Sequence, residues 1–271
     1  MSRVFDALRT TGSQIPATLL ASAWSVDALD KNVKQESFST ATIQAGPESH
    51  LIFQQEPNGP CAERYRLLRY RLQSAPTEAH LKTLLITSPG AEEGKSTVSL
   101  NLAAALAETK NQRVLLLEGD LRCPSLVREL ALTFSPGLTD WSGNEDVSFE
   151  PMIRRIEPLG FYLLPAGKAM GNPAELLNSE WFSTLISKLT ASFDWVVIDA
   201  PPVLPMVDVL SLKRFADATI VVAWAGRTRQ ERIAESIRLL GRNHVVGVLL
   251  NGVRRFERSY DEYYRHYGEG K

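Results

Sequence analysis

The sequence has little cysteine, no excess of charge of either sign and no long apolar run. Its two cysteines, Cys61 and Cys123, form no metal-ligand spacing, and we interpret them as thiols in a reducing compartment. With 30 basic and 31 acidic side chains the net charge is -1, which argues against nucleic-acid binding and against a basic membrane-binding surface. No stretch approaches the ~20 apolar residues of a membrane span, so we expect a cytoplasmic protein.

The most informative segment is a glycine-containing loop between an apolar run and a helical pattern. Residues 88–97 read Ser-Pro-Gly-Ala-Glu-Glu-Gly-Lys-Ser-Thr, after the run Leu84–Ile86 and before a helical stretch from Val98 to Glu108. A strand, a loop ending in Gly-Lys-Ser-Thr and a helix together predict a nucleotide phosphate site, in which backbone N–H groups face the phosphates. The candidate nucleotide-binding residues are Gly90, Glu93, Gly94, Lys95, Ser96 and Thr97.

Two side chains of this loop carry specific roles in the prediction. Lys95 supplies a positive charge for the β- and γ-phosphates, and the Ser96 hydroxyl is a candidate Mg²⁺ ligand. Pro89 stands where the usual pattern has glycine, and proline has no N–H to donate. The alternative interpretation is a glycine turn beside a surface lysine.

Further apolar runs predict the rest of a parallel sheet. Most are continuous rather than alternating, which is typical of strands buried on both faces, with crossover helices between them. The fold class predicted is therefore α/β, a doubly wound and mainly parallel sheet flanked by helices. The strand candidates are Leu84–Thr87, Val114–Leu117, Phe161–Leu164, Trp195–Ile198, Thr219–Val222 and Val245–Leu250.

The composition divides the chain into three parts. Residues 1–60 are predicted to be a poorly ordered leader and linker, in which Val4, Phe5 and Leu8 form one side of a short helix. Residues 61–253 are the predicted nucleotide-binding domain. Residues 254–271 form a polar tail that carries Tyr260, Tyr263, Tyr264 and Tyr267.

Acidic side chains follow two of the predicted strands. The run Val114–Leu117 leads into Glu118 and Asp120, and the run Trp195–Ile198 leads into Asp199. In a doubly wound sheet, ligands bind beyond the carboxyl ends of the strands, where such acids hold Mg²⁺ or orient an attacking group. A single acid at a strand end is more often a turn or cap residue. Their occurrence together with the phosphate loop favours Asp120 and Asp199 as metal-shell residues and Glu118 as a catalytic carboxylate.

Three motifs in this order resemble those of the bacterial tyrosine kinases of polysaccharide synthesis and export. That family carries a Walker A loop, an Asp-x-Asp-x-Arg motif called Walker A′ and a Walker B strand ending in Asp-x-x-Pro. The corresponding segments here are residues 94–97 (Gly-Lys-Ser-Thr), 118–122 (Glu-Gly-Asp-Leu-Arg) and 199–202 (Asp-Ala-Pro-Pro). The resemblance continues through residues 172–177 and 250–253 and covers roughly residues 60–271.

The resemblance implies an ATP-dependent and Mg²⁺-dependent tyrosine autokinase that regulates exopolysaccharide polymerisation or export. It makes residues 61–253 the kinase domain, with Lys95, Glu118, Asp120 and Asp199 as its catalytic residues. Glu118 is the candidate base for the tyrosine proton. It is one methylene longer than the aspartate usual in the family, and catalysis depends on placement at the ångström scale.

Two further segments are similar to family features. Glu63, Arg66 and Arg69 fit a Glu-x-x-Arg-x-x-Arg motif that implies ring-like self-association, whereas composition alone favours a solvated charged face. Tyr65, Leu68 and Leu72 occupy the other side of that helix and are expected to pack inward. The tail tyrosines are the implied autophosphorylation sites, with a tyrosine-rich docking peptide as the alternative.

The resemblance also implies partners and a location. We expect a ring-like homo-oligomer, the cytoplasmic end of a membrane chain-length regulator as activator, and recruitment by that partner to the inner face of the cell membrane. One alternative function is a non-catalytic nucleotide-binding scaffold of a polysaccharide assembly complex. Another is a positioning ATPase of the ParA/MinD type, but those proteins carry a signature lysine where this chain has Gly90.

Overall fold

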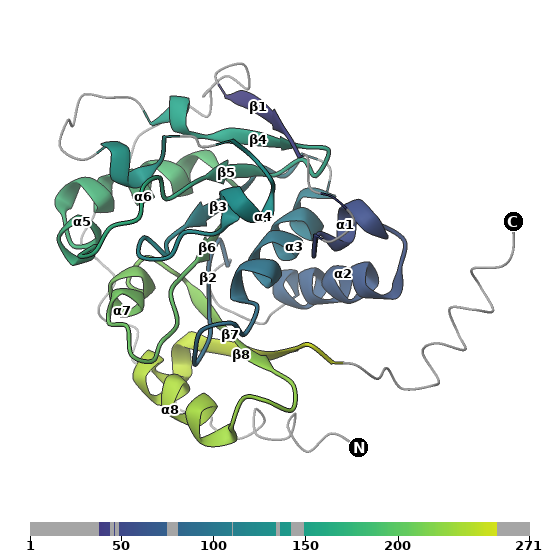
Figure 1. The fold of residues 1–271 in the computed structure, drawn as a ribbon, viewed down its shortest axis with the longest axis vertical. Coiled ribbons are helices and arrows are strands. Elements are labelled where there is room, and N and C mark those ends of the chain that lie inside the picture. Colours follow the sequence, from purple (N-terminus) through teal and green to yellow (C-terminus); the bar gives the residue numbers. More distant parts are fainter. Residues whose placement is uncertain are drawn as a thin grey trace, which may run out of the picture. The chain divides into compact units, whose positions relative to one another are not determined.

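The computed structural model describes residues 38–43, 46, 49–74, 81–109, 111–133, 136–141 and 149–253. All of them lie in the second of the two units into which the chain divides, Asn32–Lys271. They form one eight-stranded sheet with helices on both faces (Figure 1). The predicted leader helix and the tail tyrosines lie outside the described residues.

The sheet confirms the predicted fold class. In chain order, the strands are β1 Ser39–Thr42, β2 Thr83–Thr87, β3 Val114–Glu118, β4 Arg154–Glu157, β5 Tyr162–Leu164, β6 Trp195–Asp199, β7 Ala218–Trp224 and β8 Val245–Asn251. Across the sheet they follow the order β1-β4-β5-β3-β6-β2-β7-β8. β4 and β5 pair antiparallel, and the other neighbours pair in parallel.

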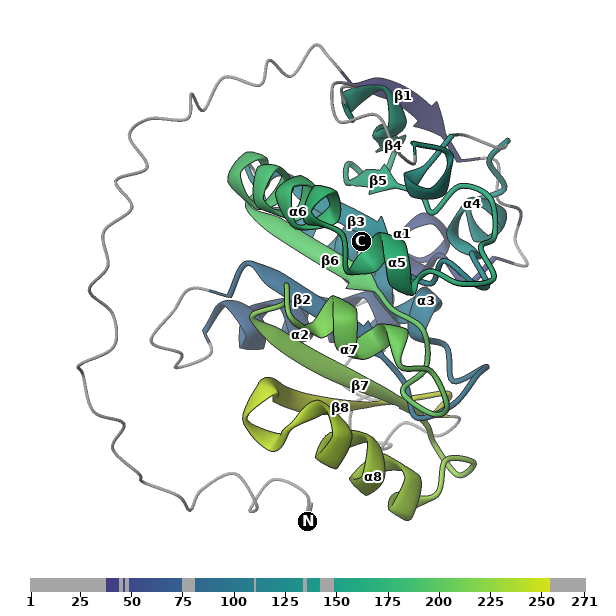
Figure 2. The same cartoon turned by 90° about the vertical axis from the view of Figure 1, so that its left-hand side faces the viewer.

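Helices cover both faces of this sheet. Figures 1 and 2 show α2 and α3 on one face and α6, α7 and α8 on the other. The α-helices are α1 Ile52–Gln55, α2 Pro60–Gln73, α3 Lys95–Ala107, α4 Leu126–Glu129, α5 Ala174–Leu177, α6 Glu180–Ser192, α7 Asp208–Lys213 and α8 Gln230–Leu240, with 3₁₀ turns at Leu138–Trp141, Glu150–Met152 and Arg242–His244. Within the described part of the chain, no helix combines the length and the apolar character needed to cross a membrane.

The apolar strand runs supply two cores, one on each face of the sheet. Successive side chains of a strand point to opposite faces. Leu84 and Ile86 of β2 accordingly pack with Leu102 of α3, whereas Leu85 packs with Leu185 of α6 in the second core. Each predicted strand is present. The runs of β2, β3, β5 and β6 are continuous because both faces are buried, whereas β8, at the edge of the sheet, leaves Val248 and Leu250 exposed.

The structure corrects the prediction at one edge of the sheet. Within the stretch predicted to be an irregular leader and linker, residues 39–42 form β1 and residues 52–55 form α1. β4 was not predicted either. β1 and β4 are four residues each and pair with one another, and β1 is largely exposed. Their place in the sheet is set by backbone pairing rather than by an apolar run, so the sequence carries little signal for them.

The sheet order brings the predicted motifs together. β3, β6 and β2 are neighbours, so their carboxyl ends share one edge. Asp199 at the end of β6 pairs in register with Glu118 of β3 on one side and with Ile86 of β2 on the other. The phosphate loop and the acidic strand ends therefore meet at this edge.

Candidate active site

The loop between β2 and α3 has the tight backbone that a phosphate site needs. Gly94 ends the loop with a φ of 80°, a conformation that glycine adopts without strain. A Cβ atom at residue 94 would lie 2.0 Å from Asn251 Nδ2, and this amide donates to the Glu93 carbonyl at 3.2 Å. The end of β8 thus closes the loop from outside, and α3 begins directly at Lys95.

Lys95 lies among the acids that follow β3 and β6. Its Nζ is 3.0 Å from Asp120 Oδ2, and both side chains are largely buried. Burial alone would lower the pKa of Lys95, but the negative charges of Asp199 and Asp120 outweigh it, and the pKa is raised. Lys95 is therefore a cation at neutral pH. It also lies 3.3 Å from the Ser96 hydroxyl, so the two residues predicted to hold nucleotide and metal are adjacent.

Asp199 is fully buried but incompletely paired. Ser99, a residue of α3 that the sequence analysis did not select, donates its hydroxyl to Oδ1 at 3.1 Å. Oδ2 accepts no hydrogen bond from the described residues. Burial raises the pKa of this carboxyl, while Lys95 and the hydroxyls of Ser96 and Ser99 act in the opposite direction. A bound cation would complete this environment.

Glu118 has a different environment from the two aspartates. Its Oε1 accepts backbone N–H groups of Ser125 and Leu126 at 2.6 and 2.7 Å, and its Oε2 accepts the N–H of Ala166 at 2.9 Å. Burial raises the pKa of Glu118, and these hydrogen bonds partly offset the effect. The carboxylate therefore ties the start of α4 to the segment after β5.

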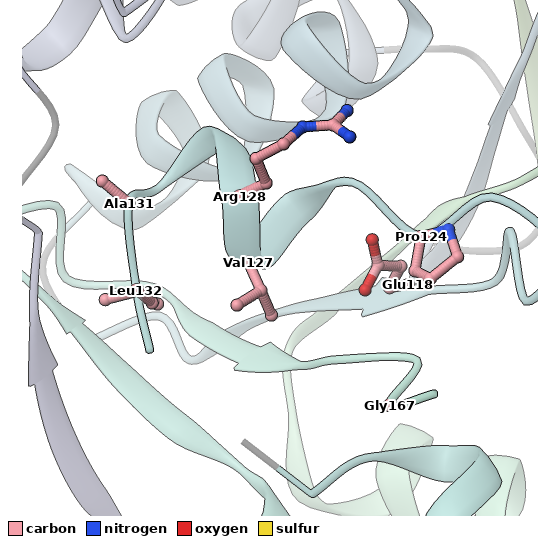
Figure 3. Close-up of a pocket in the computed structure, with 7 residues that line it drawn as sticks. All are labelled: Glu118, Pro124, Val127, Arg128, Ala131, Leu132 and Gly167. Atoms are coloured by element: carbon pink, nitrogen blue, oxygen red, sulfur yellow. The ribbon is translucent and has the colours of Figure 1, made fainter. Parts of the chain in front are cut away.

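The Glu118 carboxylate also lines a pocket of ≈ 480 Å³ beside α4. Figure 3 shows it at one end of this space, near Pro124 and Gly167, with Val127 and Arg128 further along. The remaining lining residues are Ala131 and Leu132. The pocket therefore combines an apolar wall with the Glu118 carboxylate at one end.

Arg122, the arginine of the Walker A′ segment, is held by a residue that the sequence analysis did not identify. Its Nε and Nη2 donate to the buried Asp208 of α7 at 2.5 and 3.3 Å, and its Nη1 donates to the Gly171 carbonyl at 2.5 Å. Asp208 follows the Walker B segment by several residues in the sequence, and nothing in its local pattern distinguishes it from a helix-start acid.

The predicted association motif on α2 makes contacts within its own chain. Arg66 pairs with Glu63 at 2.5 Å and with Glu108 at 2.5 Å, and it donates to the Pro57 carbonyl at 2.8 Å. Arg69 pairs with Glu108 at 3.2 Å. Leu72 is buried and Tyr65 and Leu68 pack against the core, as predicted, so α2 is anchored on α3 through both its apolar and its charged side chains.

The side chain of Glu93 faces away from the phosphate position. Its Oε2 accepts the Thr228 hydroxyl at 2.6 Å and the Trp224 backbone N–H at 3.2 Å, which joins the loop to the end of β7. Glu93 can therefore serve a nucleotide only through its backbone. Thr228 and Trp224 lie far from the loop in sequence, and only the pairing of β7 with β2 brings them near.

The fold and the site define the class of the protein. Residues 84–270 match the family model described as the CobQ/CobB/MinD/ParA nucleotide binding domain. This match covers more than half of the chain, so the chain belongs to that family of P-loop nucleotide-binding domains.

Individual relatives narrow the class. The chain is 31% identical over 219 residues to tyrosine-protein kinase YwqD of Bacillus subtilis, which covers 80% of this chain and 92% of that protein. The kinase domain of the Escherichia coli tyrosine kinase ETK has a TM-score of 0.71 at 25% identity and covers 86% of this chain and 97% of that domain. The chain belongs to the bacterial tyrosine kinases, as the resemblance predicted, and its enzyme class is that of a protein-tyrosine kinase.

The relatives differ in length. Tyrosine-protein kinase wzc of Salmonella typhimurium is 29% identical over 261 residues, and the match covers 95% of this chain but 35% of wzc. This chain thus spans about a third of that relative.

Proposed function

We propose that this chain is an ATP-dependent protein-tyrosine autokinase that regulates exopolysaccharide polymerisation or export. The observation that carries the proposal is the group formed by Lys95, Asp120 and Asp199 at the end of a phosphate loop. A largely buried cation beside two buried acids suits phosphoryl transfer, which depends on positioning and on charge stabilisation.

ATP would lie against the backbone N–H groups of the loop at the N-terminus of α3, with Lys95 at its phosphates. Ser96, Asp120 and Asp199 would hold Mg²⁺, and the unpartnered Oδ2 of Asp199 supports this assignment. The described residues contain no group of three or more His, Cys, Asp or Glu side chains placed to hold a metal, so we expect the phosphates to complete the shell. When bound, Mg²⁺ would neutralise the negative charge that develops on the transferred phosphoryl group.

Glu118 is the proposed base for the tyrosine hydroxyl. Its raised pKa favours proton acceptance, and its Oε2 has one backbone partner, which leaves a lone pair for the phenol.

The hydrogen bonds of Glu118 also favour the second candidate function, a nucleotide-binding scaffold without kinase turnover, because they restrain the carboxylate. The acceptors would be Tyr260, Tyr263, Tyr264 and Tyr267 of a neighbouring subunit.

We further propose a ring-like homo-oligomer, an activator formed by the cytoplasmic end of a membrane chain-length regulator, and recruitment to the inner face of the membrane by that partner. Arg66 and Arg69 would contribute to the ring contact. Because both are already paired with Glu108, association would require them to share or exchange this partner.

Substitution of Lys95 tests the kinase function. We expect Lys95→Met to lower autophosphorylation with Mg²⁺ and ATP by on the order of 100-fold or more, because the charge at the phosphates is lost. The measurement is anti-phosphotyrosine signal after ATP incubation, together with circular dichroism. Lys188→Met, an exposed lysine on α6, is the matched control. A folded Lys95→Met protein with undiminished signal would refute the kinase function, and a parent protein that binds ATP but never becomes phosphorylated would favour the scaffold.

A further inference from the structure

The hydroxyl of Ser125 is directed at the phosphate loop and not at its own helix. Ser125 directly precedes α4, a position where a serine side chain commonly accepts an N–H group of the helix that it precedes. The Ser125 side chain makes no such bond, and the N–H groups of Ser125 and Leu126 bind the Glu118 carboxylate. The Ser125 hydroxyl instead donates to Ser96 Oγ, 3.2 Å away on the first turn of α3.

Ser125 thereby links two residues that have separate proposed roles. Its N–H group lies 2.6 Å from the carboxylate of Glu118, the proposed base, and its hydroxyl contacts Ser96, the proposed Mg²⁺ ligand. The phosphoryl group would pass from the metal-bound nucleotide to a tyrosine at Glu118. Ser125 therefore contacts the residues at both ends of this path.

Metal binding at Ser96 would change the partner of the Ser125 hydroxyl. The Ser96 oxygen accepts two donors, the Ser125 hydroxyl at 3.2 Å and Lys95 Nζ at 3.3 Å. A hydroxyl oxygen has two lone pairs, so a cation at Ser96 must displace at least one of these donors. Neighbouring ligands of an octahedral Mg²⁺ lie about 3 Å apart, because each is about 2.1 Å from the ion. A donor that reaches Ser96 is therefore within reach of a phosphate oxygen bound to the same cation.

We propose that Ser125 is a further nucleotide-binding residue, whose hydroxyl donates to an oxygen of the γ-phosphate of ATP when Ser96 holds Mg²⁺. The γ-phosphate is chosen over the β-phosphate because Ser125 also contacts Glu118, towards which the phosphoryl group is transferred. The inference rests on the proposed function and adds to it a residue that distinguishes ATP from ADP.

A comparison of two nucleotides separates this contact from mere support of the metal site. Ser125→Ala removes the hydroxyl, and Ser125→Thr retains it. Ser187→Ala, which removes an exposed hydroxyl on α6, is the matched control. Affinities for ADP and for a non-hydrolysable ATP analogue are measured by calorimetry in the presence of Mg²⁺. The melting temperature of each variant is measured without nucleotide.

We expect Ser125→Ala to bind the ATP analogue about tenfold more weakly than the parent protein, because a hydrogen bond to a charged group is lost. Its affinity for ADP should equal that of the parent protein, and Ser125→Thr should retain the affinity for both nucleotides. The melting temperatures should agree.

An equal loss of affinity for ADP and for the analogue would mean that Ser125 only supports the Ser96 side chain, and it would overturn the proposal. An unchanged affinity of Ser125→Ala for the analogue would overturn it as well. A parent protein that binds neither nucleotide would instead refute nucleotide binding at this loop.

Discussion

At the residue scale, Asp199 combines complete burial with an incomplete set of partners. Ser99 donates to Oδ1, while none of the described residues donates to Oδ2. A buried carboxylate without full compensation destabilises the folded state, and the raised pKa of Asp199 has the same physical origin. Such a local cost to stability is expected at a functional position, where a ligand completes the environment.

The pH dependence of stability tests this environment. Because the folded pKa of Asp199 is raised above its ordinary value of 3.8, the folded state binds more protons than the unfolded state between the two values, and stability falls as pH rises through that window. The Asp199→Asn variant has no carboxyl group at this position, so its stability does not fall in this way as pH rises. We expect it to be at least as stable as the parent protein at pH 7 without nucleotide or Mg²⁺. Urea unfolding from pH 4 to pH 8 is the measurement, and a lower stability of the variant at pH 7 would contradict the argument.

The same substitution that preserves or raises stability should lower catalysis. We expect Asp199→Asn and Asp120→Asn each to lower Mg²⁺-dependent autophosphorylation by on the order of 100-fold, because the developing phosphate charge loses its placed cation. Initial rates over a Mg²⁺ titration are the measurement. If both variants kept the parent rate at limiting Mg²⁺, these two residues would not be the metal shell.

At the scale of elements, Glu108 joins α2 to α3. It lies directly after α3 and accepts Arg66 and Arg69 from two successive turns of α2. The Glu108 side chain is partly exposed, and its pKa is lowered because the hydrogen bond and charge of Arg66 outweigh burial. The charged face of α2 is therefore partly neutralised within the chain. A contact between subunits through Arg66 and Arg69 would compete with Glu108 for these arginines.

Substitution of the α2 arginines and substitution of Glu108 should change self-association in opposite directions. We expect Arg66→Ala combined with Arg69→Ala to disperse the oligomer. Glu108→Gln should increase the fraction of protein in the oligomer, because the glutamate no longer competes for the arginines. Light scattering of the unphosphorylated protein is the measurement, with the activator fragment added if needed. An unchanged mass for the arginine variant would support the solvated-face interpretation. Dispersal by Glu108→Gln as well would mean that these side chains only fix α2 on α3.

At the scale of the whole molecule, the acidic site and the tyrosine-rich tail suggest a cycle. Phosphorylation adds about -1.5 to -2 charges per tyrosine at neutral pH. Four such residues in one short tail would carry several negative charges, and Glu118, Asp120 and Asp199 already make the proposed acceptor site acidic. Repulsion between the two would release the phosphorylated tail and weaken the ring, which could pace polymerisation or export.

Transfer between subunits is the requirement of this cycle. A Lys95→Met protein, which keeps its tyrosines, is mixed with a variant whose Tyr260, Tyr263, Tyr264 and Tyr267 are replaced by Phe. We expect phosphate on the Lys95→Met chain, because the second protein supplies an intact site. A mixture without phosphotyrosine, while the parent protein is active in parallel, would argue for transfer within one chain.

Much of the molecule follows from local sequence. The continuous apolar runs predict the strands buried on both faces, since such runs have few other stable arrangements. The segment around Lys95 predicts the phosphate loop, because strand, glycine loop and helix are contiguous. β1 and β4 were missed, because both are four-residue strands whose place beyond β5 is set by backbone pairing and not by an apolar run.

Tertiary structure alone decided which distant side chains complete the site. Glu108 meets Arg66 because α2 packs on α3, and the order of the strands brings Asp208 to Arg122 and Arg232 to Gly90. An isolated charged residue on a predicted helix looks like a solvated side chain, since its local pattern carries no information on a partner that is distant in the sequence. The sequence therefore determined the family, the strands and the contiguous motifs, whereas the packing of distant elements determined the partners and charge balance of each motif residue.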